Sequence, residues 1–223
     1  MNSSIPLTQK LYLLAIHPEK GGLISASYSV MNTVLNGAMF LELFLNKNIR
    51  FDQKKVVFLN DRTSDPLHRF LLEKIKQKSE PVKISTWIGK LSFSQKQIRK
   101  EVQKGLVARR IIKMEPHQFL FFKWQKSKII NKQPLFNLIS DIEYQIFRGT
   151  ENEEEIMLLS MLKPAGLIKR IFPEREKRNR ADNELKNLMV ENQVSVAVSE
   201  AIAAAQAVAA SVAVSAAMAG ARR

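Results

Sequence analysis

The sequence predicts a mainly α protein, a single globular helical domain over residues 1–223 with a buried central helix and two short β-hairpins. Apolar residues recur at three- and four-residue spacing along most of the chain. Residues 29–46 are apolar around most of the helical circumference, as expected of a central helix. Two short stretches, 49–59 and 109–124, carry strand-like runs on either side of a polar segment.

The helix boundaries follow from capping residues and from the apolar spacing. Asp65 is a predicted N-cap with Pro66 at the first helical position, Ser94 is a second predicted N-cap, and Gly149 ends a helix that Pro134 opens. The predicted helices span, in order, residues 7–16, 29–46, 66–75, 84–91, 94–107, 134–148, a helix that starts in the acidic run 151–155, the stretch 167–172, and an alanine-rich final helix. Residues 173–184 read as a charged link.

The two hairpins are placed by their polar segments. The first joins residues 49–51 to 56–59 across the turn 52–55. In the second, the tight segment Glu115 to Gln118 is the predicted turn, between 109–114 and 119–124.

The composition narrows the classes of protein. The chain has no cysteine, which removes disulfides, thiolate catalysis and Cys-ligated zinc and fits a reducing compartment. The first residues lack the pattern of a signal peptide, so a cytoplasmic protein is expected. Residues 201–221 carry no charge, but alanine and serine dominate them, which favours a buried final helix over a membrane anchor.

The positive charge is concentrated in the middle of the chain. The formal net charge is +14, and residues 83–132 hold thirteen basic residues against Glu101 and Glu115. A solvated basic face would serve solubility alone. This concentration instead predicts a surface for a polyanion, either nucleic acid or the acidic face of a membrane.

The helix predicted at 94–107 places part of that charge on one arc. Lys96, Arg99, Lys100 and Gln103 fall on one side, opposite Ile98 and Val102. Lysine and arginine at this spacing can bind a phosphate group, so these residues are candidate ligands of an anion.

The second hairpin adds apolar side chains to the basic ones. Its candidate residues are Phe119, Leu120, Phe121, Phe122, Lys123 and Trp124. Aromatic rings mixed with lysines suit a membrane interface. The same mixture would serve a homo-oligomer interface through residues 115–124, or alternate residues of the strand could face the core.

Catalytic motifs are not found in the sequence. His17, His68 and His117 stand singly without the spacing of metal ligands, and they are interpreted as structural or exposed. The sequence therefore predicts a binding protein rather than an enzyme, with no cofactor and no metal.

An ordered set of segments resembles the Golgi phosphoprotein 3 family. The matching segments are residues 5–7, 11–16, 20–24, 35–43, 63–65, 87–88, 105–107, 119–122 and 167–173. The likeness spans nearly the whole length of the chain. The chain is therefore identified as a member of this family, and a divergent one because of the positions described next. The resemblance implies a helical peripheral membrane protein on the cytosolic face of a membrane, one that recognises phosphatidylinositol 4-phosphate.

The resemblance also assigns roles to particular positions. Lys96 and Arg99 fall where the family has two basic head-group ligands, and the hairpin falls where the family inserts into lipid or joins subunits. Ser27 and Asn36 stand where the family has a tryptophan and an arginine ligand, so lipid specificity does not carry over. General attraction to anionic lipid should survive this loss.

Two other functions stay open at this point. A basic helix followed by a hairpin also resembles the helix and wing of a winged-helix nucleic-acid-binding protein. The apolar run 119–122 argues against it, because a wing that contacts phosphates has little use for such residues. The third hypothesis is a structural scaffold that oligomerises through the hairpin.

Overall fold

The computed structural model describes residues 5–191 and residue 207. The helices are α1 (Leu7–Ala15), α2 (Ser25–Tyr28), α3 (Met31–Leu45), α4 (Pro66–Lys76), α5 (Ile84–Lys90), the 3-10 helix η1 (Leu91–Ser94), α6 (Gln95–Ala108), α7 (Gln133–Arg148), α8 (Glu153–Leu162), α9 (Ile168–Ile171) and α10 (Arg175–Glu191). The strands are β1 (Ile49–Asp52), β2 (Lys55–Phe58), β3 (Val82–Lys83), β4 (Ile112–Phe119) and β5 (Phe122–Ile129). The predicted mainly α class is confirmed.

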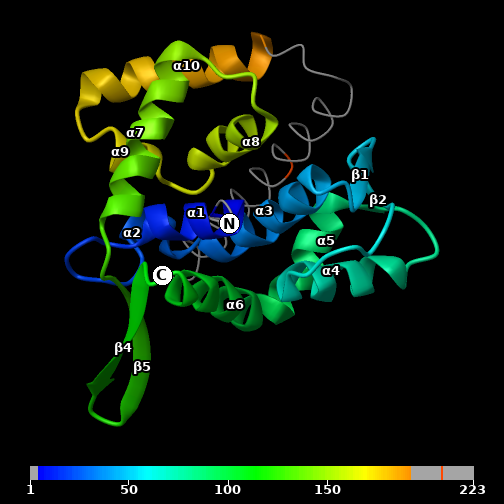
Figure 1. Cartoon of the computed structure of the whole chain (residues 1–223), viewed down its shortest axis with the longest axis horizontal. Helices are drawn as coiled ribbons and strands as arrows, with labels where there is room; N and C mark the ends of the chain where they lie inside the picture. The colour runs from blue at the N-terminus through cyan, green and yellow to red at the C-terminus, as the bar shows by residue number, and fades with distance from the viewer. Residues whose placement is uncertain (1–4, 192–206, 208–223) are drawn as a thin grey trace, which may run out of the picture.

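Helices α1 and α3 lie side by side through the middle of the molecule (Figure 1). Helix α6 packs against both on one side, where α4 and α5 also contact α3. Helix α8 packs against both on the other side, with α10 over it and α7 beside it. The β4–β5 hairpin projects away from this body beyond the end of α6. The helices therefore form layers around the α1–α3 pair, and the hairpin is an arm outside them.

The predicted central helix is confirmed as α3. Every residue from Thr33 to Leu43 is buried, although Thr33, Asn36 and Glu42 are polar. A helix that is apolar on all sides must be covered on all sides. The helices of both layers cover it, and Phe40 at its centre packs against Trp87 of α5, with 6.4 Å between the ring centroids.

The helix caps follow the predictions in two cases and depart from them in one. The Asp65 carboxylate accepts hydrogen bonds from the backbone N–H groups of Leu67 and His68 at 2.7 and 3.1 Å, so it caps α4 as predicted. Gly149 ends α7 with a φ of 82°, which suits glycine. Ser94 precedes α6 without a capping hydrogen bond, because α6 continues directly from η1 and has no free first turn.

The first hairpin is present and forms part of a larger sheet. Strands β1 and β2 pair antiparallel, and the last pair of residues, Asp52 and Lys55, are the two ends of the predicted turn. The short strand β3 adds to the other side of β2, so the sheet has three strands in the order β1-β2-β3. A strand of two residues is too short to leave a period in the sequence.

The predicted turn of the second hairpin is wrong. Residues Glu115 to Gln118 lie within β4, and the chain reverses at Leu120 and Phe121, between the paired residues Phe119 and Phe122. Pro116 suggested a turn, but a two-stranded hairpin has open outer edges where a missing N–H is tolerated. The true turn lacks the Asn, Asp or Gly residues that signal a tight hairpin.

The predicted charged link at 173–184 is also wrong, because α10 begins at Arg175. This helix is polar on most of its surface and buries Ala181 and Leu185, with Leu188 packed at the edge of the core. Three apolar residues at four- and three-residue spacing are a weak signal against so many charges. Apart from Ala207, which packs at the edge of the core, the predicted alanine-rich final helix lies outside the described residues.

Candidate functional site

Helix α6 separates its side chains into a buried face and a basic face. Ile98, Val102 and Leu106 recur every four residues and are buried against the core. Lys96 and Lys100 are exposed, and neither forms an ion pair with a residue that the structure describes. These two predicted ligands therefore present uncompensated ammonium groups to solvent.

Arg99 lies at the edge of this face and is held in place. Its Nη2 atom donates a hydrogen bond to Oδ1 of Asn32 at 2.6 Å, and Nδ2 of Asn32 donates to Oε1 of Gln95 at 2.9 Å. The guanidinium group keeps further N–H donors for another acceptor. Asn32 was not predicted as a site residue, because a lone polar residue at the start of an apolar helix gives no functional signal. Its role is to fix Arg99 against α3.

Ser27 and Asn36 lie in the interior, where neither can touch a head group. Ser27 has no exposed surface, and its hydroxyl donates to the carbonyl of Ala165 at 2.6 Å. Asn36 is equally buried, and Nδ2 donates to the carbonyl of Ile88 at 3.4 Å. The structure therefore does not support their place among the predicted head-group contacts. The exposed aromatic residue in this region is Tyr28, next to Ser27.

The fourth residue of the predicted arc, Gln103, anchors the hairpin. Its Nε2 atom donates to the hydroxyls of Tyr12 at 2.7 Å and Ser127 at 3.2 Å, and these two hydroxyls lie 3.0 Å apart. The N–H of Gly22 also donates to the carbonyl of Ser127 at 2.8 Å. Side chains from α1, α6 and β5 thus meet in one hydrogen-bonded cluster, which fixes the base of the hairpin to the body.

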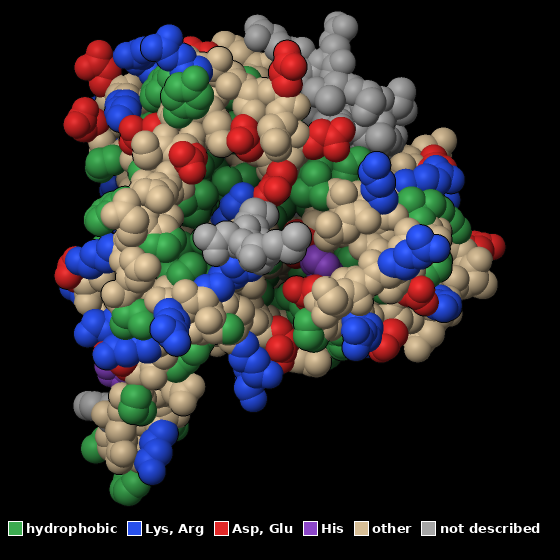
Figure 2. Space-filling model, viewed as in Figure 1, with side chains coloured by type: hydrophobic (Ala, Val, Ile, Leu, Met, Phe, Trp, Pro, Cys, Tyr) green, Lys and Arg blue, Asp and Glu red, His purple; other side chains and the backbone are tan. Residues whose placement is uncertain are grey.

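The end of the hairpin is apolar and exposed. Phe121 is 96% exposed, Phe122 73% and Leu120 67%, and Trp124 is also exposed behind them. The predicted alternative, in which these residues face the core, is wrong for these four side chains. Figure 2 shows hydrophobic side chains at the end of this arm together with a basic one.

The tip also has an unusual backbone. Leu120 has a φ of 52°, a conformation that costs a residue with a side chain on the order of 1 kcal/mol. Glycine or asparagine would adopt it more easily. Exposed apolar residues in a strained turn favour a functional role, because neither the turn nor the core requires them.

Basic side chains surround this apolar tip. Lys123 is exposed on β5, and Lys126 is half-buried farther along the same strand. Farther back, the Glu115 carboxylate lies 3.0 Å from Nζ of Lys113 and 3.4 Å from Nζ of Lys128. The hydrogen bond from Lys113 is the main cause of the lowered pKa of Glu115. The only acidic residue of the two strands is thus paired with lysines, so the arm as a whole is basic.

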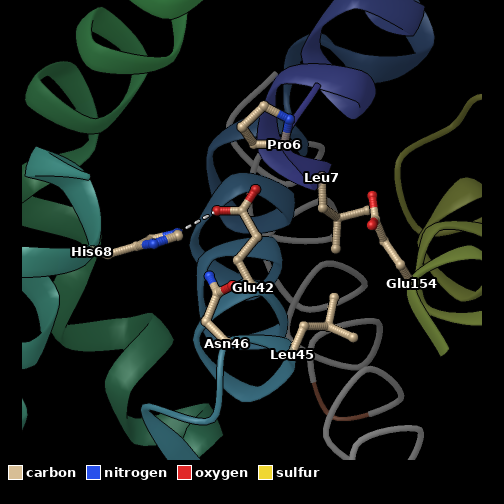
Figure 3. Close-up of a pocket in the computed structure, with 7 residues that line it drawn as sticks. All are labelled: Pro6, Leu7, Glu42, Leu45, Asn46, His68 and Glu154. Carbon is tan, nitrogen blue, oxygen red and sulfur yellow. Dashed lines mark hydrogen bonds and ion pairs between the residues drawn. The ribbon is translucent and has the colours of Figure 1, made fainter. Parts of the chain in front are cut away.

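The three histidines occupy structural positions. Nδ1 of His17 accepts from the backbone N–H groups of Glu19 and Lys20, and the ring of His117 stacks on Trp124. Nε2 of His68 lies 2.7 Å from the Glu42 carboxylate, beside a pocket of about 160 Å³ (Figure 3). The described residues contain no group of three or more acidic or histidine side chains placed to hold a metal ion.

A family comparison accounts for most of the chain. The family model of Golgi phosphoprotein 3 matches residues 7–205. The chain belongs to the Golgi phosphoprotein 3 family. A search of curated proteins gave no match.

Membership of the Golgi phosphoprotein 3 family confirms the resemblance drawn from the ordered segments. Within the described part of the chain, no helix combines the length and the hydrophobicity needed to span a bilayer. The candidate surface of this family member combines the basic face of α6, the guanidinium group of Arg99 and the apolar arm.

Proposed function

We propose that this protein binds the anionic head groups of a membrane surface as a peripheral protein on its cytosolic face. The exposed apolar tip of the β4–β5 hairpin carries the proposal, because a run of exposed apolar residues on a basic arm suits insertion between lipid head groups. Lys96 and Lys100 supply charge on the neighbouring helix, and Lys123 supplies it on the arm.

Arg99 is the residue that would favour a phosphorylated head group such as phosphatidylinositol 4-phosphate. Its guanidinium is held by Asn32, so it loses little further side-chain entropy when it binds a phosphate. Ser27 and Asn36 contribute no contact, so the selectivity rests on Arg99 with Lys96 beside it.

The proposed role is binding without catalysis. The most enclosed acid and base pair among the described residues is Glu42 with His68, and both oxygens of this carboxylate already accept hydrogen bonds within the protein. A carboxylate used in this way is a structural group. We therefore expect neither hydrolysis nor modification of the bound lipid.

Vesicle flotation tests the proposal. Wild-type protein is mixed with vesicles of neutral lipid, with vesicles containing phosphatidylserine, and with vesicles containing phosphatidylinositol 4-phosphate. We expect flotation with both anionic compositions, and a further gain with the phosphoinositide that Arg99→Ala removes. The Lys96→Ala, Lys100→Ala double variant should bind anionic vesicles roughly thirtyfold more weakly, at about 1 kcal/mol for each lysine.

The matched control removes the same charge from another part of the molecule. Lys169 and Lys186 are exposed on α9 and α10, which lie away from α6 (Figure 1). The Lys169→Ala, Lys186→Ala variant should float like the wild type. Equal losses in both double variants would contradict a defined binding face, and no flotation of the wild type would contradict the function itself.

The two other hypotheses predict different results. A nucleic-acid-binding protein would bind duplex DNA with an affinity that falls steeply with salt and would ignore the vesicles. A scaffold that oligomerises through the hairpin would change its size on gel filtration when Phe121→Asp and Phe122→Asp are introduced, without any effect of lipid.

A further inference from the structure

The exposed side of α6 has an apolar residue at each end and three lysines between them. Phe93, in the 3-10 turn that leads into α6, is 96% exposed, and Val107 near the end of the helix is 41% exposed. Between them the exposed residues of the stripe are Lys96, Lys100 and Lys104. These five residues follow at spacings of three, four, four and three, so they share one side of the helix.

Packing within the described structure does not explain why residue 93 is an aromatic residue. Leu91, two residues earlier in the same turn, is buried in the core, whereas the Phe93 ring touches almost nothing. A fully exposed phenylalanine gains nothing for folding, and exposed apolar groups of this kind mark interaction surfaces when others lie nearby.

The surroundings of Phe93 are basic. No acidic residue occurs between Pro81 and Lys100, while Lys90 and Lys96 flank the ring in sequence and both are exposed. Glu101 is the first acidic residue on α6, and it pairs with Lys104 at 2.7 Å. Phe93 is therefore an exposed aromatic ring with lysines nearby, as the rings of the hairpin tip are.

We propose that α6 lies flat on the anionic bilayer and that Phe93 inserts as a second apolar anchor. This inference rests on the proposed function and extends it to a residue at the other end of the helix. Helix α6 has fourteen residues, so Phe93 stands roughly 20 Å from the helix end that leads into the hairpin. The hairpin and Phe93 would then contact the membrane at two separate points.

A bilayer fits this arrangement better than a protein partner does. The two apolar points are separated by the length of a helix, and lysines lie between them. A protein interface usually has a continuous apolar centre with the charges at its rim. A lipid layer is wide, flat and anionic, so it can receive an isolated ring at each point and neutralise the lysines between them.

Single-cysteine labelling tests the position of Phe93 directly. The chain has no cysteine, so Phe93→Cys, Phe121→Cys and Tyr144→Cys each give one attachment point for an environment-sensitive fluorophore. Tyr144 is the matched control, an aromatic residue 67% exposed on α7. The labelled proteins are mixed with phosphatidylserine vesicles, with neutral vesicles, and with duplex DNA. We expect a blue shift at positions 93 and 121 with the anionic vesicles alone, and no shift at 144.

Each other result overturns the inference. A shift at position 121 without one at 93 would leave the proposed function standing and remove the second anchor. No shift and no flotation at any position would remove both. A response at 93 to DNA instead of vesicles would identify a nucleic-acid surface.

Flotation of unlabelled variants gives an independent measure. Phe93→Ser should bind anionic vesicles roughly tenfold more weakly, since an inserted phenylalanine side chain contributes that much or more. Phe93→Leu should restore most of the binding, because the anchor needs an apolar group and not a ring. Tyr144→Ser should bind like the wild type, and an equal loss for Phe93→Ser and Tyr144→Ser would contradict the inference.

Discussion

Glu42 connects three parts of the molecule through one buried carboxylate. Oε1 accepts from the backbone N–H of Thr8 at 2.7 Å and from its hydroxyl at 2.9 Å, and Oε2 lies 2.7 Å from Nε2 of His68 (Figure 3). Pro6, which precedes α1, cannot cap that helix, so a residue of α3 supplies the negative charge to its first turn. A polar residue in the central helix is thereby explained.

The pKa of His68 makes the stability of the fold depend on pH. Burial lowers this pKa, but the hydrogen bond to Glu42 and the charges of Glu42 and Asp65 raise it by more, so it lies above the ordinary value. A raised pKa means that folding favours the protonated ring. The pair therefore stabilises the protein fully below about pH 6.5, and the contribution is lost as the pH rises through the folded-state pKa.

Thermal unfolding between pH 6 and pH 9 measures this effect. The wild type should lose stability toward pH 9, and His68→Gln, which keeps a hydrogen-bond donor but cannot be charged, should show a flatter profile. Parallel profiles for the two proteins would contradict a charged His68.

Leu120 places an apolar side chain at the tip of the hairpin in a backbone conformation that destabilises the turn. Leu120→Gly should relieve the positive φ, slow amide hydrogen exchange in β4 and β5 by a stabilisation of about 1 kcal/mol, and weaken binding to anionic vesicles. Leu120→Ala is the control, since it removes most of the side chain and keeps the strained backbone. It should bind as weakly as the glycine variant without the slower exchange. Stronger vesicle binding by Leu120→Gly would count against the tip as an insertion point.

The sequence predicted the single residues that stand on regular, exposed helix positions. Lys96 and Lys100 lie where the helical period puts them, because α6 is regular and its apolar residues fix its rotation. The period could not predict that Arg99 is bonded to Asn32, since that contact joins residues 67 positions apart. The burial of Ser27 and Asn36 was missed for the same reason, because it depends on how α2 and α3 pack.

At the scale of elements, the close approach of α2 to the loop before α9 limits which residues fit. Gly166 has a φ of 69°, and an added Cβ would lie 2.5 Å from the carbonyl oxygen of Ala26. Gly166→Ala should therefore destabilise the protein by roughly 2 to 4 kcal/mol in a chemical denaturation experiment.

A second glycine provides the control for that experiment. Gly89 lies in helix α5, and apart from its chain neighbours and the backbone of that helix no atom lies within 4 Å of an added Cβ. Gly89→Ala should stabilise the protein by about 0.5 to 1 kcal/mol, because alanine loses less backbone entropy in a helix. Similar losses in both variants would show that the contact with Ala26 does not determine the result.

Elements with strong amphipathic period were predictable, and elements defined by a partner were not. Helices α4, α6 and α7 carry apolar stripes that need no tertiary information. The turn of the second hairpin was misplaced because its residues, Leu120 and Phe121, are not typical of tight turns. Helix α10 was missed because only a narrow stripe of it is buried. Both misses lie where exposure or charge overrides the ordinary pattern.

On the scale of the whole molecule, most of the net positive charge lies toward one end. Acidic and basic side chains are mixed on the upper part of the surface in Figure 2, around α7, α8 and α10, whereas the charged side chains along the outer part of the hairpin are basic. The sequence predicted this concentration of positive charge, because the segment 83–132 that holds most of the net charge folds into consecutive elements from α5 to the hairpin. Long-range attraction to an anionic surface would therefore turn that end of the molecule toward the surface before contact.

The hydrogen-bonded cluster at the base of the hairpin also affects how the body would be oriented on a membrane. Tyr12, Gln103 and Ser127 bond one another, and Gly22 bonds the same strand, so the arm has no hinge where it leaves the body. Because the hairpin is attached rigidly, the depth and tilt of its tip in a bilayer would determine the depth and tilt of the whole body. Once the tip is inserted in lipid, α8 and α10 would lie at a fixed height above the bilayer and face the aqueous side in a fixed orientation.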